Sequence, residues 1–268
     1  MKKVSIRQNW LLIKTLWRMR LSHLMVFRLS FFGATFVDGT LFLVQLLMFQ
    51  AMYSWVDTIG TFSRGQMFIF VGTFSLINAL NMVIDFFGVL GISGKIRDGS
   101  LDHYLTKPMS PLLRLTFENL NPGSLPLIAL SAVIIGYGVE VCGVHVDALT
   151  AMLYLLMVAL MTLLWYDCMV VLRTLPFFFI STSAVDEMEG NLIDGCFRVP
   201  GVLFTGVWKV IFWFVLPYGV MATVPTQLLT GALTFEGGAY AVGLTVVFTW
   251  FTLWFWRFGL RHYKSASS

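Results

Sequence analysis

The sequence predicts an all-α membrane protein with six transmembrane helices, an amphipathic interfacial helix before them, and both termini in the cytoplasm. Only 12% of the 268 residues are charged, while 57% are hydrophobic. The mean hydropathy is +0.80, and apolar runs recur that are long enough to cross a hydrocarbon core of roughly 30 Å as helices. Transmembrane β-strands would instead give short segments of alternating polarity, and the sequence contains none.

Residues 1–26 are predicted to form a cytoplasmic amphipathic helix that lies in the membrane interface. Lys3, Arg7, Lys14 and Arg18 fall on one side of a helical projection, and tryptophan side chains lie beside them. The alternative is a plain cytoplasmic continuation of the first span. The start resembles the basic region of a signal peptide, but basic residues interrupt the apolar stretch, so we expect no cleavage.

Residues 27–268 are predicted to form one six-span transmembrane domain. The third and fifth spans are the weakest, because "ENLNPGSLP" opens one of them and Lys209 and Pro217 interrupt the other. Either span can be bent or re-entrant where protein or water satisfies the freed backbone groups. The expected spans are Phe27–Met52, Met67–Ser93, Phe117–Val141, Ala148–Leu172, Val202–Val224 and Ala239–Phe258.

The distribution of positive charge predicts the orientation, because Lys and Arg near span ends stay in the cytoplasm. With these spans, seventeen of the eighteen basic residues fall on one side, Lys209 among them, and only Arg64 falls outside. Both termini are therefore expected in the cytoplasm. The net charge of +4 reflects this topology and does not indicate a nucleic-acid partner.

No motif in the sequence indicates catalysis, a bound cofactor or a metal site. The nearest approach to a phosphate-binding loop is "GISGKI", but its glycine spacing is wrong and Ile96 stands where Ser or Thr is required. The histidines have no partner at metal-ligand spacing. They are His23, His103, His145 and His262.

Four acidic residues lie within the expected spans, where charged groups are costly and face a bundle interior or a wet cavity. Asp38 lies near the middle of its span, whereas Asp85, Glu118 and Asp167 lie toward the cytoplasm. They either line a substrate route or hold helices together. In a third interpretation, Asp38 couples transport to protons.

The most polar stretch of the chain, Gly94–Pro111, follows the second span. Its core predicts a short helix with Leu101, Tyr104 and Leu105 on one face and Pro108 at its end. So small an apolar face is expected to need a groove on a partner protein. The alternative is an ordinary solvated loop.

The string "IRDGSLDHYLTKP", Ile96–Pro108, resembles the hallmark of permease subunits of type-2 ABC exporters, in the bacterial branch with six spans. In that branch an Ile, a Gly-x-Leu-Asp and a Leu-x-Lys/Arg-Pro recur after the second span. The segment "VLPYGVMATVPTQLLTG", Val215–Gly231, is similar to a second signature of the branch. The acidic run "VDEMEG" departs from its pattern.

The resemblance implies a multi-pass permease of the bacterial inner membrane that works as a homodimer or as a heterodimer with a second permease. It implies a separate ATPase subunit, which binds ATP and Mg, so this chain needs no cofactor. Residues 94–114 would be the coupling-helix loop that sits in a cleft of that ATPase. The ATPase contacts so implied are Arg97, Asp98, Leu101, Asp102, Tyr104 and Lys107.

The expected function is export of an amphipathic drug-like, peptide or lipid-like compound, with membrane lipids as further partners. The aromatic richness of the spans suits such a substrate, although aromatic residues at span ends are also ordinary interface anchors. The alternative functions are a proton-coupled secondary transporter or channel that uses Asp38, and a structural or assembly factor. The halves show no convincing inverted repeat of the kind found in carriers.

Overall fold

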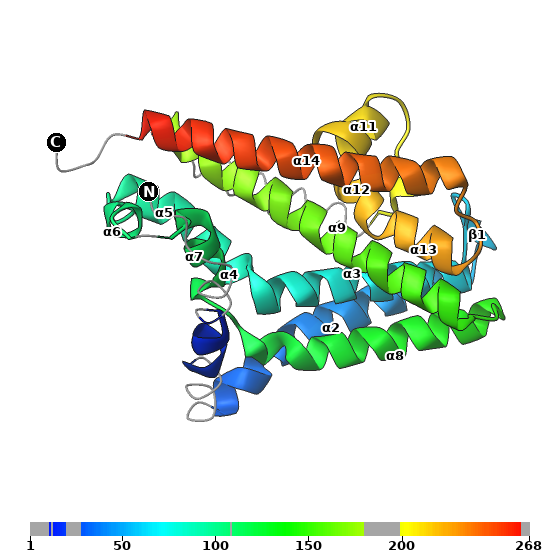
Figure 1. Cartoon of the computed structure of the whole chain (residues 1–268). Coiled ribbons are helices and arrows are strands. Elements are labelled where there is room, and N and C mark those ends of the chain that lie inside the picture. Colours follow the sequence, from blue (N-terminus) through cyan, green and yellow to red (C-terminus); the bar gives the residue numbers. More distant parts are fainter. Residues whose placement is uncertain (1–10, 12, 20–27, 108, 180–198, 264–268) are drawn as a thin grey trace.

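The computed structural model describes residues 11, 13–19, 28–107, 109–179 and 199–263, without the side chains of residues 28–35. Expectations for residues 1–10, for residues 20–27 and for the acidic run lie outside this part. Figure 1 shows long helices side by side, with the short helices α4 to α7 at one end and strand β1 at the other. We call these the platform end and the hairpin end.

Four long apolar helices confirm a multi-pass membrane protein of the all-α class. They are α3 (Arg64–Ile84), α8 (Leu125–Cys142, preceded by the 3-10 turn η1), α9 (Ala148–Thr174) and α14 (Phe235–His262). Helix α2 (Arg28–Met52) has 25 residues. Its part with described side chains, Phe36–Met52, is apolar but shorter than the other four. Six spans therefore remain a prediction.

A small β-hairpin joins α2 to α3. Strands β1 (Thr58–Ile59) and β2 (Phe62–Ser63) pair antiparallel, and Gly60 between them has φ 63°, which glycine adopts without steric cost. The side chain of Ser63 then accepts a hydrogen bond from the backbone of Gln66 and caps α3.

Helices α3 and α8 pack closely because small residues line their contact. A Cβ added to Gly72 would lie 2.7 Å from Cγ1 of Ile135. The hydroxyl of Ser131 donates to that of Ser75 across the same contact, at 2.7 Å. Small side chains and hydrogen bonds of this kind hold helices together where lipid removes the hydrophobic driving force.

The second span ends earlier than predicted. Helix α3 stops at Asp85, whose φ of −138° lies outside the helical region, and the chain continues as α4 (Phe86–Leu90) and α5 (Ile92–Arg97). Gly88 lets α4 pack closely on α7 (Pro111–Glu118), because an added Cβ would be 2.3 Å from the carbonyl oxygen of Thr116. The predicted end at Ser93 is therefore wrong.

The third span also begins later than predicted. Phe117 and Glu118 belong to α7 (Pro111–Glu118), a separate helix of the platform. The membrane helix starts with η1 (Pro122–Ser124), because Pro122 cannot continue a preceding helix and Asn121 caps the new one through the backbone N–H of Gly123.

The predicted fifth span, Val202–Val224, is bent rather than straight, which is one of the possibilities that Lys209 and Pro217 indicated. It consists of helix α11 (Gly206–Val210) and the π-helical turn η4 (Ile211–Val215), followed by α12 (Tyr218–Met221) and α13 (Thr223–Leu229). The two halves meet at an angle of 78°. The break falls at Pro217, which cannot donate the backbone hydrogen bond that a continuous helix requires.

This bent pair starts and ends at the hairpin end of the bundle. Leu203, in the 3-10 turn η3 (Gly201–Leu203), packs on Gly60 of the hairpin, since a Cβ added to Gly60 would be 2.7 Å from its Cδ2. At the other end of the pair, α14 begins near the hairpin and runs to the platform (Figure 1). The pair is therefore a re-entrant segment.

Two consequences follow for the predicted topology. Lys209 lies in the re-entrant segment toward the hairpin end, so its expected place with the other basic residues is wrong. Phe177, at the end of the 3-10 turn η2 (Leu175–Phe177) after α9, lies at the platform end, whereas Gly201 lies at the hairpin end. Residues 180–198 between them lie outside the described part.

The core lies where α3, α9 and the re-entrant segment converge. Trp165 is 1% exposed, and its ring lies 5.3 Å from that of Phe74 and 6.0 Å from that of Tyr218. The re-entrant segment is thus anchored in the bundle by a buried aromatic side chain.

Candidate functional site

The platform, residues 86–118, contains the short helix that the sequence predicts, α6 (Asp102–Leu105). Its apolar side is turned inward: Leu101 is fully buried and Tyr104 is 9% exposed, while Leu105 is 39% exposed. The premise that this helix cannot bury its apolar face within the chain is therefore wrong. The chain itself covers Leu101 and Tyr104.

A polar cluster joins α5, α6 and α7. The hydroxyl of Tyr104 donates to Oε2 of Glu118 at 2.6 Å, and Nζ of Lys95 lies 3.2 Å from the same oxygen. The cations of Lys95 and Arg114 lie 5.2 and 5.4 Å from the centre of the Tyr104 ring. Burial, followed by the interaction with Glu118, raises the pKa of Tyr104 to about 12.

Glu118 thus forms its contacts within the platform, and its predicted place inside a span is wrong. Sequence reasoning missed its partner Lys95. The signal for this pair lay in the proline and asparagine residues of "ENLNPGSLP", which place Glu118 before the start of the membrane helix rather than within it.

A tight turn separates α5 from α6. Oδ1 of Asp98 accepts hydrogen bonds from the backbone N–H and the hydroxyl of Ser100, at 2.9 and 2.7 Å. These bonds lower the pKa of Asp98. Gly99 has φ 75°, which stops α5 and turns the chain into α6.

Tyr263 links this turn to the end of α14. Its hydroxyl donates to the carbonyl oxygen of Gly99 at 3.3 Å. Its ring lies 5.8 Å from that of Phe177, which in turn lies 5.5 Å from the ring of Trp256 in α14. Burial, followed by the neighbouring Asp102, raises the pKa of Tyr263. The platform is therefore attached to the ends of both α9 and α14.

The outward surface of the platform is polar and carries charges of both signs. Of the six predicted contact residues, Arg97, Asp98 and Lys107 are exposed, and Asp102 is half-buried. Sequence reasoning missed His103 and Thr106, which are also exposed. The helical period contained the signal, because residues two positions away from buried Leu101 and Tyr104 point away from them.

The acidic residues of the spans lie apart from one another. Asp167 in α9 is 1% exposed and accepts a hydrogen bond from the hydroxyl of Thr249 in α14 at 2.5 Å. Thr252 donates to the backbone oxygen of Asp167. This arrangement supports the role of holding helices together. Asp38 is half-buried in α2, where no described residue forms a hydrogen bond or ion pair with it.

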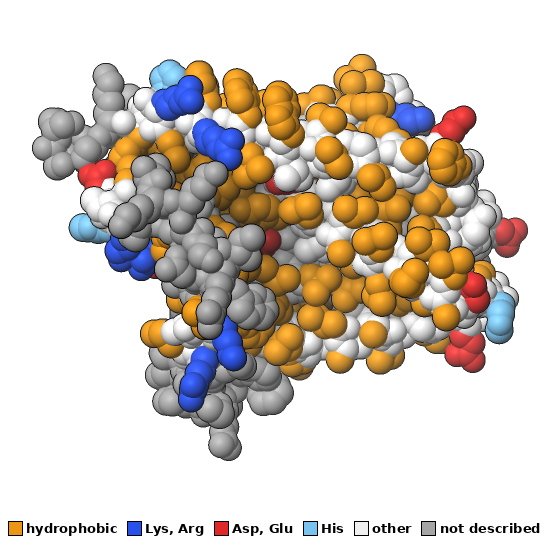
Figure 2. Space-filling view, in the orientation of Figure 1, with side chains coloured by type: hydrophobic (Ala, Val, Ile, Leu, Met, Phe, Trp, Pro, Cys, Tyr) orange, Lys and Arg blue, Asp and Glu red, His pale blue; other side chains and the backbone are white. Residues whose placement is uncertain are grey.

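Asp85 lies in the wall of a cavity of about 430 Å³ at the platform ends of α3 and α9. Its side chain is buried, and no described residue donates a hydrogen bond to its Oδ1. Leu163 of α9 and Leu253 of α14 also line this cavity. Figure 2 shows acidic atoms set back among the apolar side chains of one side of the bundle.

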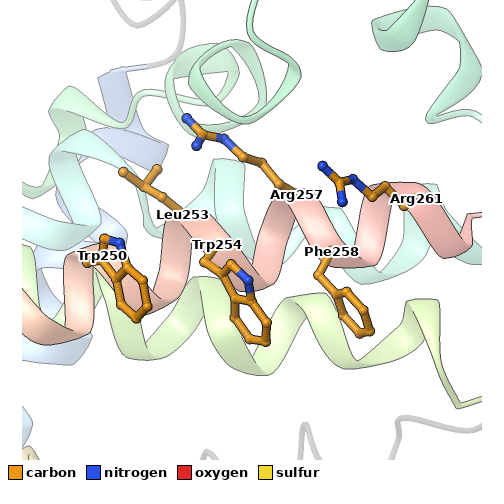
Figure 3. Close-up of a pocket in the computed structure, with 6 residues that line it drawn as sticks. All are labelled: Trp250, Leu253, Trp254, Arg257, Phe258 and Arg261. Carbon is orange, nitrogen blue, oxygen red and sulfur yellow. The ribbon is translucent and has the colours of Figure 1, made fainter.

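The platform half of α14 presents a second distinctive surface (Figure 3). Trp250, Trp254 and Phe258 project along one side of the helix, and Arg257 and Arg261 project along another. The rings of Trp254 and Phe258 stack with centroids 5.5 Å apart. Among the described residues, no group of three or more His, Cys, Asp or Glu side chains is placed to hold a metal ion.

A bundle of apolar membrane helices with a polar helical platform at one end is typical of the membrane subunit of a transporter. The chain belongs to the ABC-2 family transporter proteins, whose pattern matches residues 40–267, and it is a permease subunit of the type-2 ABC class. No curated protein and no solved structure matches it. The resemblance carried by Ile96–Pro108 is thus confirmed. Members of this family are generally non-catalytic membrane subunits that act with an ABC ATPase.

Proposed function

We propose that the chain is the permease of an ATP-driven exporter and that it forms the substrate pathway as a dimer with a second permease chain. A separate ATPase subunit binds ATP and Mg and contacts the outward surface of the platform. The observation that carries this proposal is the attachment of the platform to two membrane helices through Tyr263 and Phe177. A surface that moves with an ATPase can act on a pathway only through such an attachment.

The platform end is assigned to the cytoplasm of a bacterial inner membrane, with both termini on that side. The balance of charge supports this assignment, because the hairpin end carries only Arg64 and Lys209 among the described basic residues. The other described basic residues from Lys95 onward lie toward the platform end. They are Lys95, Arg97, Lys107, Arg114, Arg173, Arg257 and Arg261.

The six residues predicted to contact the ATPase lie in two layers of the platform. Arg97, Asp98 and Lys107 are exposed and meet the ATPase directly, together with the outer side of Asp102. Leu101 and Tyr104 support them from beneath, and we assign these two residues to transmission rather than to direct contact.

ATP binding brings two ATPase subunits together and displaces the platforms. The displacement reaches α14 through Tyr263 and reaches α9 through Phe177, so the balance between inward-open and outward-open states shifts. The energy for this shift comes from the difference in ATPase affinity for the two states.

Membrane lipids are assigned as partners of the α14 surface shown in Figure 3. At the cytoplasmic interface, Arg257 and Arg261 suit anionic headgroups, while Trp250 and Trp254 lie beside the acyl chains.

The test is co-purification of the tagged chain with its ATPase from native membranes. Arg97→Glu and Lys107→Glu reverse exposed platform charges and are expected to lower ATPase recovery at least several-fold. Arg64→Glu reverses an exposed charge at the hairpin end and is expected to leave recovery unchanged. A functioning complex that contains no nucleotide hydrolase would refute the proposal.

A further inference from the structure

The cavity beside Asp85 contains a carboxyl group whose Oδ1 has no described hydrogen-bond donor. Asp85 is 5% exposed, its Oδ1 faces no described donor, and it is the only charged residue among those that line the cavity. A buried carboxylate is costly unless an opposite charge or hydrogen bonds compensate it.

The neighbouring hydroxyl groups are already engaged as donors. Thr116 donates its proton to the carbonyl oxygen of Leu112 at 2.9 Å, so the hydroxyl of Tyr166, 2.9 Å away, donates to Thr116. Thr162 donates to the carbonyl oxygen of Val158 at 2.8 Å. None of these three hydroxyls has a second proton to give to Asp85.

Apart from Ser110, the rest of the lining is apolar, and it reaches the lipid-facing surface. Leu163 is 38% exposed and Leu253 is 42% exposed, on α9 and α14 respectively. The volume of about 430 Å³ falls in the range of pockets for drug-sized ligands. A ligand that fits this site is therefore mostly apolar, enters from the membrane, and carries one positive charge.

We propose that this cavity binds an amphipathic organic cation, with the carboxylate of Asp85 against its positive charge and its apolar groups against Leu163 and Leu253. The inference rests on the proposed export function and narrows its substrate to cationic amphiphiles. Recognition depends on one charge and on shape, so it extends to cations of different skeletons that fit the volume.

The test uses the purified full chain in lipid nanodiscs and measures binding of radiolabelled tetraphenylphosphonium by equilibrium dialysis. We expect saturable binding that Asp85→Asn weakens roughly tenfold or more, because the attraction between the carboxylate and the cation in a buried site is lost. Leu163→Trp fills the cavity and is expected to abolish saturable binding. Asp57→Asn removes an exposed acidic residue at the hairpin end and is the matched control.

Tetraphenylborate has the same shape and the opposite charge, so it is expected not to compete. Equal affinity of the wild type and Asp85→Asn, or competition by tetraphenylborate, would overturn the proposal. A measurement on the wild type avoids any folding defect: a hydrophobic carbodiimide should modify Asp85, and tetraphenylphosphonium should protect it. Modification without protection also overturns the proposal.

These measurements need no ATPase, so they separate the two proposals. If the chain binds no tetraphenylphosphonium but still co-purifies with its ATPase, the cation site is refuted and the permease function stands. If the chain binds the cation but recruits no ATPase, the export function is refuted and the cation site stands.

Discussion

The hydroxyl of Tyr263 donates a hydrogen bond to the carbonyl oxygen of Gly99 at 3.3 Å, across 164 positions of sequence. Tyr263 directly follows α14, and Gly99 forms the turn between α5 and α6. One bond therefore joins the proposed ATPase-binding surface to the last membrane helix.

Tyr263→Phe is expected to uncouple the transporter. Loss of this bond costs about 1 kcal/mol of folding free energy, so the chain still folds, while ATP hydrolysis in the reconstituted complex proceeds with several-fold less transport. The measurement compares transported substrate with ATP hydrolysed. Tyr53→Phe removes a similar bond to the carbonyl oxygen of Phe62 at the hairpin end and should keep the wild-type ratio. Equal ratios in both variants would refute the coupling role.

The polar cluster around Tyr104 is expected to make the stability of the chain fall at high pH. The pKa of Tyr104 rises from 10.0 to about 12 on folding, so the folded state holds this proton more tightly than the unfolded state. The contribution to stability is complete below the unfolded pKa and is lost as the pH rises through the folded pKa. As the pH rises from the unfolded pKa to the folded pKa of Tyr104, the free energy of unfolding should therefore fall less for Tyr104→Phe than for the wild type. Parallel losses in denaturant titrations of both proteins would contradict this.

The bond between Asp167 and Thr249 is expected to stabilise the contact of α9 with α14. Asp167→Ala leaves the half-buried Thr249 hydroxyl without its acceptor and should cost about 1–3 kcal/mol of unfolding free energy. A double-mutant cycle with Thr249→Val should show coupling between the two positions. Thr245→Val is the control, because the Thr245 hydroxyl bonds only within its own helix. A change in transport without a change in stability would favour the substrate-route interpretation.

Gly88→Ala is expected to separate α4 from α7. The new methyl group would lie 2.3 Å from the carbonyl oxygen of Thr116 and 2.4 Å from that of Leu115, both of them backbone atoms. The chain should show a lowered unfolding temperature and weaker ATPase recovery. Gly94→Ala adds the same group where no other heavy atom lies within 4 Å and should match the wild type. Similar unfolding temperatures for both variants would contradict this expectation, because the added methyl group would then not destabilise the contact of α4 with α7.

Asp38→Asn is expected to leave transport and its pH dependence unchanged, because ATP rather than a proton gradient drives the proposed cycle. Transport into inverted vesicles, with ATP or with an imposed pH gradient, provides the measurement. Transport driven by the gradient alone and lost in Asp38→Asn would favour the proton-coupled carrier.

The sequence by itself determined the membrane class, most span positions and the family. Apolar runs in the regions of α3, α8, α9 and α14 must lie within the membrane whatever their neighbours are, so composition and length locate them. The string Ile96–Pro108 is also local, and it was sufficient to indicate a type-2 permease. These features depend on neighbouring residues along the chain, which a single sequence contains.

Only the tertiary structure decided where the platform begins, which of its residues face outward, and that the bent pair, residues 206–229, returns to the end where it starts. Leu101 is buried and Glu118 is paired because helices distant in sequence meet there. The cavity at Asp85 likewise depends on α3, α7, α9 and α14 together. Apolar content is similar in a re-entrant pair and in a span, so the contact of Leu203 with Gly60 was needed to tell them apart.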